Sequence, residues 1–145
     1  MREKTLNMLG LMRRANAIAV GETNTGAAVR AGKAKILLLA QDASDNARRR
    51  AEGFVYGRST IMLRVPFTKE EISDHVGLNG CSMAAVTDIG FANALMKSLA
   101  AQWPEEFTAA ADEIAQRFGK SQKRKNEAAA HERNKRIGKR RNARA

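Results

Sequence analysis

The chain has 145 residues, of which 43% are hydrophobic, so it can bury one modest core and is too short for two ordinary domains. It carries 26 lysine and arginine residues against 15 aspartate and glutamate residues, and the formal net charge of +11 indicates a polyanionic partner such as nucleic acid or an anionic membrane surface. A single cysteine excludes an internal disulfide, and no apolar run approaches the roughly 20 residues of a membrane span, so we expect a cytoplasmic protein without a membrane segment.

Apolar residues repeat at helical spacing through residues 2–16, which predicts a helix that ends near Asn16. Short apolar runs bounded by turn residues predict strands at 18–20, 35–40, 59–65 and 82–86. Between these strands, capping residues predict a short helix carrying Arg30 and further helices at about 45–55, 69–76 and 88–100. Strands therefore alternate with helices, which predicts an α/β fold, a three-layer α/β/α sandwich.

Pro104 marks the boundary between a domain at 1–103 and an additional C-terminal amphipathic helix at 104–118. The apolar stripe of this helix consists of Phe107, Ala111, Ile114 and Phe118. From Gly119 on, the composition shifts to lysine, arginine, asparagine, glutamine and alanine, so 119–145 is expected to be a basic tail that is disordered when free.

The tail region holds most of the net charge, since residues 117–145 contain 12 basic and 2 acidic side chains. Its default role is nonspecific contact with phosphate groups. The residues assigned to this role are Lys120, Lys123, Arg124, Lys125, Arg133, Lys135, Arg136, Lys139, Arg140 and Arg141.

The segment Gly21–Thr25 joins the first strand to the helix that carries Arg30. Backbone amides and small polar side chains gather at such a helix start, and the helix dipole favours anions there, so phosphate is a natural ligand. Lys33 and Lys35 flank the turn into the next strand. The other interpretation of the segment is a solvated helix N-terminus without a ligand.

No catalytic, metal or cofactor site is evident in the sequence. Gly21 and Gly26 have the spacing of half a P-loop, but alanines follow where that loop needs lysine and a hydroxyl residue, which excludes a nucleotide triphosphatase. Asp42 lies beside Ser44 between a strand and a helix, where such residues normally cap. The two histidines are isolated, and Cys81 has no basic partner and is expected to be a small buried or loop residue.

Three segments of the chain resemble a known family. They are LGLMRRANAIAVGE at 9–22, AKILLLAQDASDN at 34–46 and AAVTDIGFANAL at 84–95. Together they resemble the L-seven-Ae and L-thirty-e ribosomal proteins, which bind kinked RNA, and most closely the small bacterial YlxQ-like branch. The resemblance implies a four-stranded mixed sheet, an RNA partner with ribosomal RNA as the leading target, and an apolar loop at Leu78–Cys81 that packs against a flipped or stacked base.

The chain departs from the family at the RNA-binding loop. That loop usually reads glycine, any residue, asparagine, glutamate, two residues and lysine, and here the three contact positions are Thr23, Asn24 and Ala27. Because the lysine is missing, recognition of a standard kink-turn is left open while RNA binding is retained.

The resulting hypothesis is a noncatalytic, monomeric RNA-binding protein, associated with ribosomal RNA and with a possible ribosomal or translation-related protein partner. The residues assigned to RNA contact are Gly21, Glu22, Thr23, Asn24, Thr25, Arg30, Lys33, Asp42, Leu78, Asn79, Gly80 and Cys81. The alternative is a protein-interaction module that holds a partner through the helix Phe107–Phe118 and binds nucleic acid nonspecifically through the tail.

Overall fold

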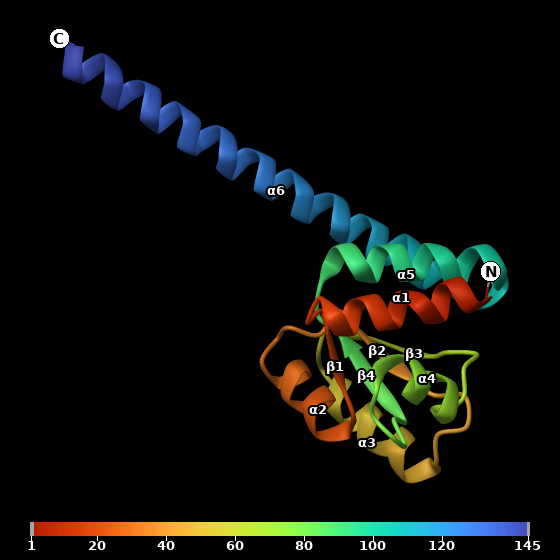
Figure 1. Ribbon diagram of the computed structural model, residues 1–145. Coiled ribbons are helices and arrows are strands. Elements are labelled where there is room, and N and C mark those ends of the chain that lie inside the picture. The colour runs from red at the N-terminus through yellow and green to blue at the C-terminus, as the bar shows by residue number, and fades with distance from the viewer. Residues whose placement is uncertain (1, 145) are drawn as a thin grey trace.

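The computed structural model describes the backbone of residues 2–144 and the side chains of residues 2–135. Within this part of the chain, six helices and four strands follow one another as Figure 1 shows. The elements are α1 Arg2–Arg14, β1 Ile18–Val20, α2 Glu22–Arg30, β2 Ile36–Leu39, α3 Asp45–Val55, β3 Ile61–Arg64, α4 Lys69–Val76, β4 Met83–Val86, α5 Ile89–Gln102 and α6 Pro104–Arg144.

The four strands form one mixed sheet in the order β1-β4-β2-β3. β4 is antiparallel to both neighbours, whereas β2 and β3 are parallel, so β1, β2 and β3 all run in the same direction. We call the edge at which these three strands end the carboxyl edge, and the edge at which they begin the amino edge. The α/β fold and the four-stranded mixed sheet expected from the sequence are confirmed.

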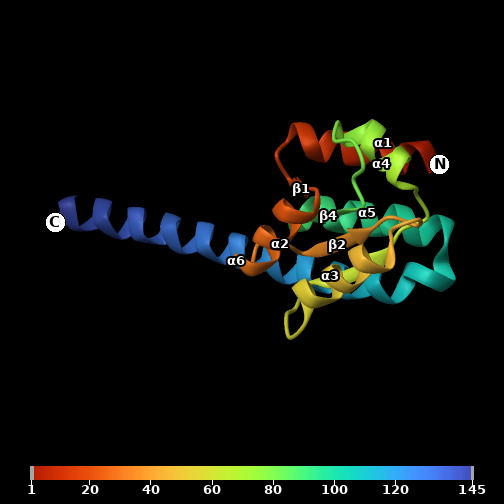
Figure 2. The ribbon, with the colours of Figure 1, turned by 90° about the horizontal axis from the view of Figure 1, so that it is seen from below.

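Helices cover both faces of the sheet, and the side chains of β2 show how. Ile36 and Leu38 point into one buried cluster, which also contains residues of α1, α4, α5 and α6. Leu37 and Leu39 point into a second cluster with residues of α2 and α3. All four side chains are at most 2% exposed, because successive residues of a strand face opposite sides and both sides are covered. The two layers of helices are visible in Figure 1 and, turned by 90°, in Figure 2.

The capping residues lie where the sequence indicates helix ends. Ser44 Oγ accepts a hydrogen bond from the backbone N–H of Ala47 at the start of α3, at 3.1 Å. Thr68 and Glu71 form a reciprocal capping box at the start of α4, which ends at Gly77 in the left-handed conformation, with φ of 75°. The helix–strand alternation therefore follows from local signals that the sequence carries.

The expected helix at 104–118 is the first part of a longer helix, and its apolar residues are packed into the core of the domain. α6 runs without interruption to Arg144, because each of its two glycines, at positions 119 and 138, costs only about 1 kcal/mol and no proline follows Pro104. Phe107 and Ile114 are buried in the same cluster as α1 and α5, so the core packing crosses the boundary expected at Pro104. The end of the helix at Phe118 was wrongly predicted, and the disorder of 119–145 in the absence of RNA stays a prediction.

Replacing Ile114 tests whether the start of α6 belongs to the core. Ile114→Ala should lower the free energy of unfolding by about 2 to 5 kcal/mol, since it removes a fully buried side chain and leaves a cavity. Chemical denaturation measures the change. The control Gln116→Ala changes an exposed residue half a turn away and should stay within about 0.5 kcal/mol. Equal effects of the two substitutions would contradict the packing of α6 on the core.

An ion pair between Arg2 and Glu71 joins α1 to α4 and predicts a pH dependence of stability. The hydrogen bond that Arg2 donates to Glu71 lowers the pKa of this carboxyl from 4.5 to about 2. The contribution of Glu71 to stability is present above pH 4.5 and is lost as the pH falls towards 2. Denaturation at several pH values should therefore show that the free energy of unfolding falls less at acid pH for Glu71→Gln than for the wild type. The control Glu70→Gln changes an exposed neighbour, and its free energy of unfolding should fall at acid pH as much as that of the wild type.

Candidate nucleic-acid interface

Two of the segments assigned to RNA contact meet at the carboxyl edge. Gly21 follows β1, and its backbone N–H donates to Met83 O at 3.1 Å. A Cβ built on Gly21 would lie 3.0 Å from Leu78 Cδ2, and the φ of Gly21 is +87°. Both the close approach and the left-handed backbone therefore require glycine here. The start of α2 and the turn at 78–81 lie side by side as a consequence.

The segment predicted as a loop at Gly21–Thr25 is the N-cap and first turn of α2. Gly21 is the N-cap and has no side chain to accept from the first-turn amides, so these donors are left to a ligand or to water. Thr23 and Asn24 are exposed on this turn, and Asn24 Nδ2 donates to Val20 O at 3.0 Å. Glu22 is held in an ion pair with Arg50 of α3. The exposed donors of the turn therefore face the edge, beside a carboxylate that is already paired.

Two residues assigned to RNA contact are buried, which corrects the prediction for their side chains. Thr25 is 0% exposed, and among the described side chains its Oγ1 has no hydrogen-bond partner. Cys81 is 1% exposed, its N–H donates to Ser73 Oγ at 3.0 Å, and its Sγ donates to Met83 O at 3.2 Å. Burial raises the pKa of the Cys81 thiol. Both side chains face the interior, and the small buried cysteine that the sequence also suggested is the correct interpretation.

Leu78 is the exposed member of the turn before β4. Its side chain is 39% exposed and lies against Gly21, while Asn79 and Gly80 beside it are exposed as well. Gly80 has a φ of 68°. An exposed apolar side chain on this turn at the carboxyl edge has the geometry for contact with a flat apolar ligand surface.

Asp42 lies after β2 at the same edge, but it caps a different helix from the one expected. Its Oδ1 accepts from the backbone N–H of Lys69 at 2.8 Å, at the start of α4. Ser44 alone caps α3. The expectation that both residues cap the helix at 45–55 is therefore wrong for Asp42. The structure assigns Asp42 a structural hydrogen bond, and its side chain remains exposed.

Arg30 and Lys33 lie away from this cluster. Arg30 ends α2, about 12 Å along the helix from its start, and its guanidinium lies 6.0 Å from the Phe54 ring centroid. Lys33 follows α2 near the amino edge. A hollow of about 330 Å³ beside β1 joins Lys33 to Asn24 and to Arg13 of α1. Sequence reasoning missed Arg13, since its only signal was a basic helix end.

The basic residues of α3 and α6 differ in whether they form ion pairs. Arg48 and Arg50 are ion-paired, whereas Arg49 is exposed and makes no ion pair with any described side chain. The tail residues that the structure describes are all exposed, namely Lys120, Lys123, Arg124, Lys125, Arg133 and Lys135. The side chains of Arg136, Lys139, Arg140 and Arg141 lie outside the described residues.

The described residues do not assemble a metal or nucleophile site. His75 Nδ1 lies 2.8 Å from Glu71 O, so one ring nitrogen is engaged with the helix backbone. Among residues 2–135, no group of three His, Cys, Asp or Glu side chains is arranged to hold a metal ion. No described helix is long and apolar enough to cross a membrane.

Comparison with known proteins identifies relatives over most of their length, although no protein-family model matches the chain. An RNA-binding protein YlxQ of Enterococcus faecium is 33% identical over 95 residues, which cover 63% of this chain and 86% of the relative. The chain belongs to the YlxQ family. A second YlxQ protein, from Bacillus subtilis (strain 168), is 32% identical over 96 residues, with 63% of this chain and 91% of the relative covered.

A solved structure shares the fold of this YlxQ family member. It is a protein of unknown function from Bacillus halodurans C, with a TM-score of 0.57 and 25% sequence identity. The match covers 63% of this chain and 92% of the other. The two YlxQ relatives and the solved structure thus each match 63% of the present chain.

The burial of Thr25 leads to a stability prediction. Thr25→Val should raise the free energy of unfolding by up to about 1 kcal/mol, because it replaces a buried hydroxyl without a partner by a methyl group of similar size. Thr25→Ser keeps the hydroxyl and deletes the methyl group, so it should lower stability by about 1 kcal/mol. Thermal denaturation of both variants measures this order. Destabilisation by valine would show that the hydroxyl has a partner.

Proposed function

We propose that this protein is a noncatalytic RNA-binding protein that recognises structured RNA at its carboxyl edge. The observation that carries the proposal is the close approach of Leu78 to Gly21, the N-cap of α2, which places an apolar side chain beside the hydrogen-bond donors of the first turn. The names of the YlxQ relatives support the RNA partner. The resemblance to ribosomal proteins makes ribosomal RNA the leading target and a ribosome-associated role in the cytoplasm the leading setting.

The proposed mechanism is recognition of RNA shape by the carboxyl edge. The uncapped N–H groups at the start of α2 and the hydroxyl of Thr23 donate to phosphate or base acceptors, where the helix dipole favours negative charge. Leu78 packs against a base that has left the stack. Sequence-specific RNA recognition mostly targets such unstacked bases, because the major groove of an A-form duplex is too deep and narrow for side chains to read.

The alternative protein-interaction function loses the feature on which it was based. Phe107 and Ile114 are at most 2% exposed. Phe118 lies against α5, because a Cβ built on Gly90 would lie 3.8 Å from Phe118 Cε2. The apolar stripe of α6 is thus covered by the core of the same chain. RNA is therefore the partner that we propose.

The proposal is tested by restoring the lysine that the family loop usually carries. Ala27 is exposed on α2, one turn from Thr23, so Ala27→Lys should strengthen binding to a kink-turn RNA by about 1 kcal/mol through a charge-assisted contact. Thr23→Ala should weaken binding by a similar amount. Parallel titrations use a kink-turn RNA and a plain duplex of the same length.

The matched control is Ala94→Lys, which adds the same charge at an exposed position of α5. It should change the affinity for both RNAs equally and slightly, because nonspecific charge does not distinguish them. If Ala27→Lys behaves like Ala94→Lys and Thr23→Ala has no effect, the carboxyl edge does not recognise RNA.

A further inference from the structure

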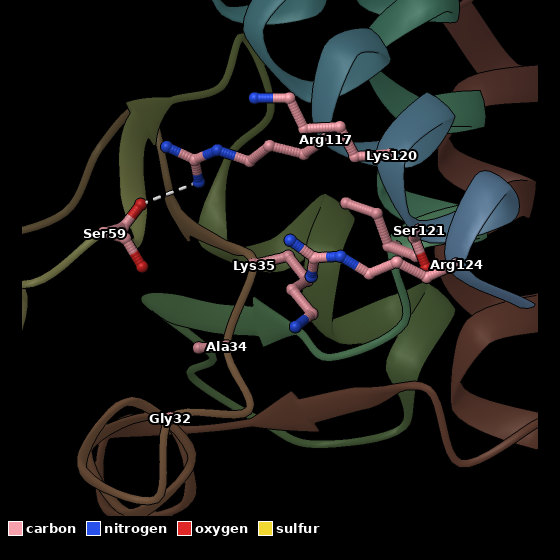
Figure 3. Close-up of a pocket in the computed structure, with 9 residues that line it drawn as sticks. Gly32, Ala34, Lys35, Ser59, Arg117, Lys120, Ser121 and Arg124 are labelled. Atoms are coloured by element: carbon pink, nitrogen blue, oxygen red, sulfur yellow. Dashed lines mark hydrogen bonds between the residues drawn. The ribbon is translucent and has the colours of Figure 1, made fainter. Parts of the chain in front are cut away.

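Cations gather at the amino edge of the sheet, opposite the edge proposed above to recognise RNA. A hollow of about 340 Å³ lies there between the turn before β2, the segment before β3, the start of α5 and one face of α6 (Figure 3). We call it the basic hollow. Its polar lining consists of Lys35, Ser59, Arg117, Lys120, Ser121 and Arg124, and no carboxylate lines it.

The contribution of α6 follows from helical spacing. Residues 117 and 124 are each three or four positions from both 120 and 121, so the four side chains lie on one face of the helix. Arg117 fixes this face against the domain, because its Nη1 donates to Ser59 O at 2.8 Å and its Nε donates to Glu113 at 2.9 Å. The remaining cations are thereby held over the amino edge rather than in free solvent.

These remaining cations are not in contact with any carboxylate among the described side chains. Lys35, Lys120 and Arg124 form no ion pair within residues 2–135. Figure 3 shows the charged ends of Lys35 and Arg124 directed into the hollow. Like charges brought together repel one another, so an anion that enters the hollow relieves this repulsion. Lysine and arginine beside serine hydroxyls are suited to a phosphate group.

A second observation at the same edge points to a nucleic acid rather than to a free anion. Another hollow, of about 270 Å³, shares Gly32, Ala34 and Ser59 with the basic hollow and is bordered by Arg58. Two residues before Arg58 lies Tyr56, the only tyrosine of the chain, with 88% of its surface exposed. An exposed aromatic ring beside a basic surface is the arrangement on which single-stranded bases stack.

We propose that the amino edge is a second RNA-binding surface, where the basic hollow holds a backbone phosphate and Tyr56 stacks on a nearby unpaired base. This inference rests on the proposed function for its choice of RNA as the partner. The two edges lie about 13 Å apart along the four residues of β2, so one structured RNA spans both. The carboxyl edge reads shape, and the amino edge neutralises phosphate.

The test compares two double variants of the full-length chain. Lys120→Gln with Arg124→Gln removes two charges from the hollow, whereas Lys123→Gln with Lys125→Gln removes two exposed charges of the same helix that do not line it. The probe is a labelled RNA hairpin with a single-stranded extension. The hollow variant should lose about tenfold in affinity, and its plot of log affinity against log salt should flatten by about 0.7 to 0.9 per lost phosphate contact. Equal losses in the two variants would overturn the proposal.

Substitutions of Tyr56 provide a second, independent test of the proposal. Tyr56→Ala should weaken binding of the single-stranded extension by about fivefold or more, whereas Tyr56→Phe keeps the ring and should bind as the wild type does. Equal affinities of all three proteins would exclude stacking at this position. Titration with inorganic phosphate, followed by NMR at Ser59 and Ser121, separates the sources of the anion. Saturation of the hollow by phosphate, without any effect of the hollow variant on RNA affinity, would also overturn the inference.

Failure of this inference is distinguishable from failure of the proposed function. If Thr23→Ala and Ala27→Lys alter RNA affinity but the hollow variant does not exceed its control, the carboxyl edge binds RNA and the amino edge does not. If none of these variants changes affinity, both proposals are wrong.

Discussion

The insertion of β4 between β1 and β2, antiparallel to both, is the constraint on which the rest of the molecule depends. It leaves β1, β2 and β3 running in one direction, so the chain must return along a helix after each of the first two strands. α2 and α3 therefore begin at the carboxyl edge, and their positive dipole ends gather there. The turn before β4 enters at the same edge and brings Leu78 to Gly21.

The same constraint separates two kinds of positive charge. At the carboxyl edge, backbone N–H groups supply the positive charge. Near the start of α2, Glu22 and Arg50 neutralise each other in an ion pair. Side-chain cations supply the positive charge at the amino edge, where Lys35 and α6 meet. Oriented amides favour directional hydrogen bonds, whereas lysine and arginine give an attraction that depends on salt. The two edges are therefore suited to different tasks on one polyanion.

The sequence predicted the strands, the caps formed by Ser44 and Thr68, and the α/β class because these depend on neighbours a few residues apart. It did not predict the cap formed by Asp42, whose partner Lys69 lies 27 residues later. The burial of Thr25 could not be predicted, since each residue of a helix turns the side chain by about 100°, and the start of α2 at Glu22 decides which face it takes. The basic hollow was also hidden. It joins Lys35 to residues of α6 that lie more than 80 positions later and that composition alone assigned to a tail.

The length of α6 has a kinetic consequence. From Gly119 to Arg144 the helix spans about 39 Å at 1.5 Å per residue, and Figure 1 shows it leaving the domain in a straight line. This distance exceeds the screening length of about 8 Å at physiological ionic strength several times over. Under the proposed function, a long RNA that meets the far end of the helix is tethered before it touches the sheet. Tethering raises its effective concentration at both edges, so the helix enlarges the target for first encounter and favours rebinding after partial release.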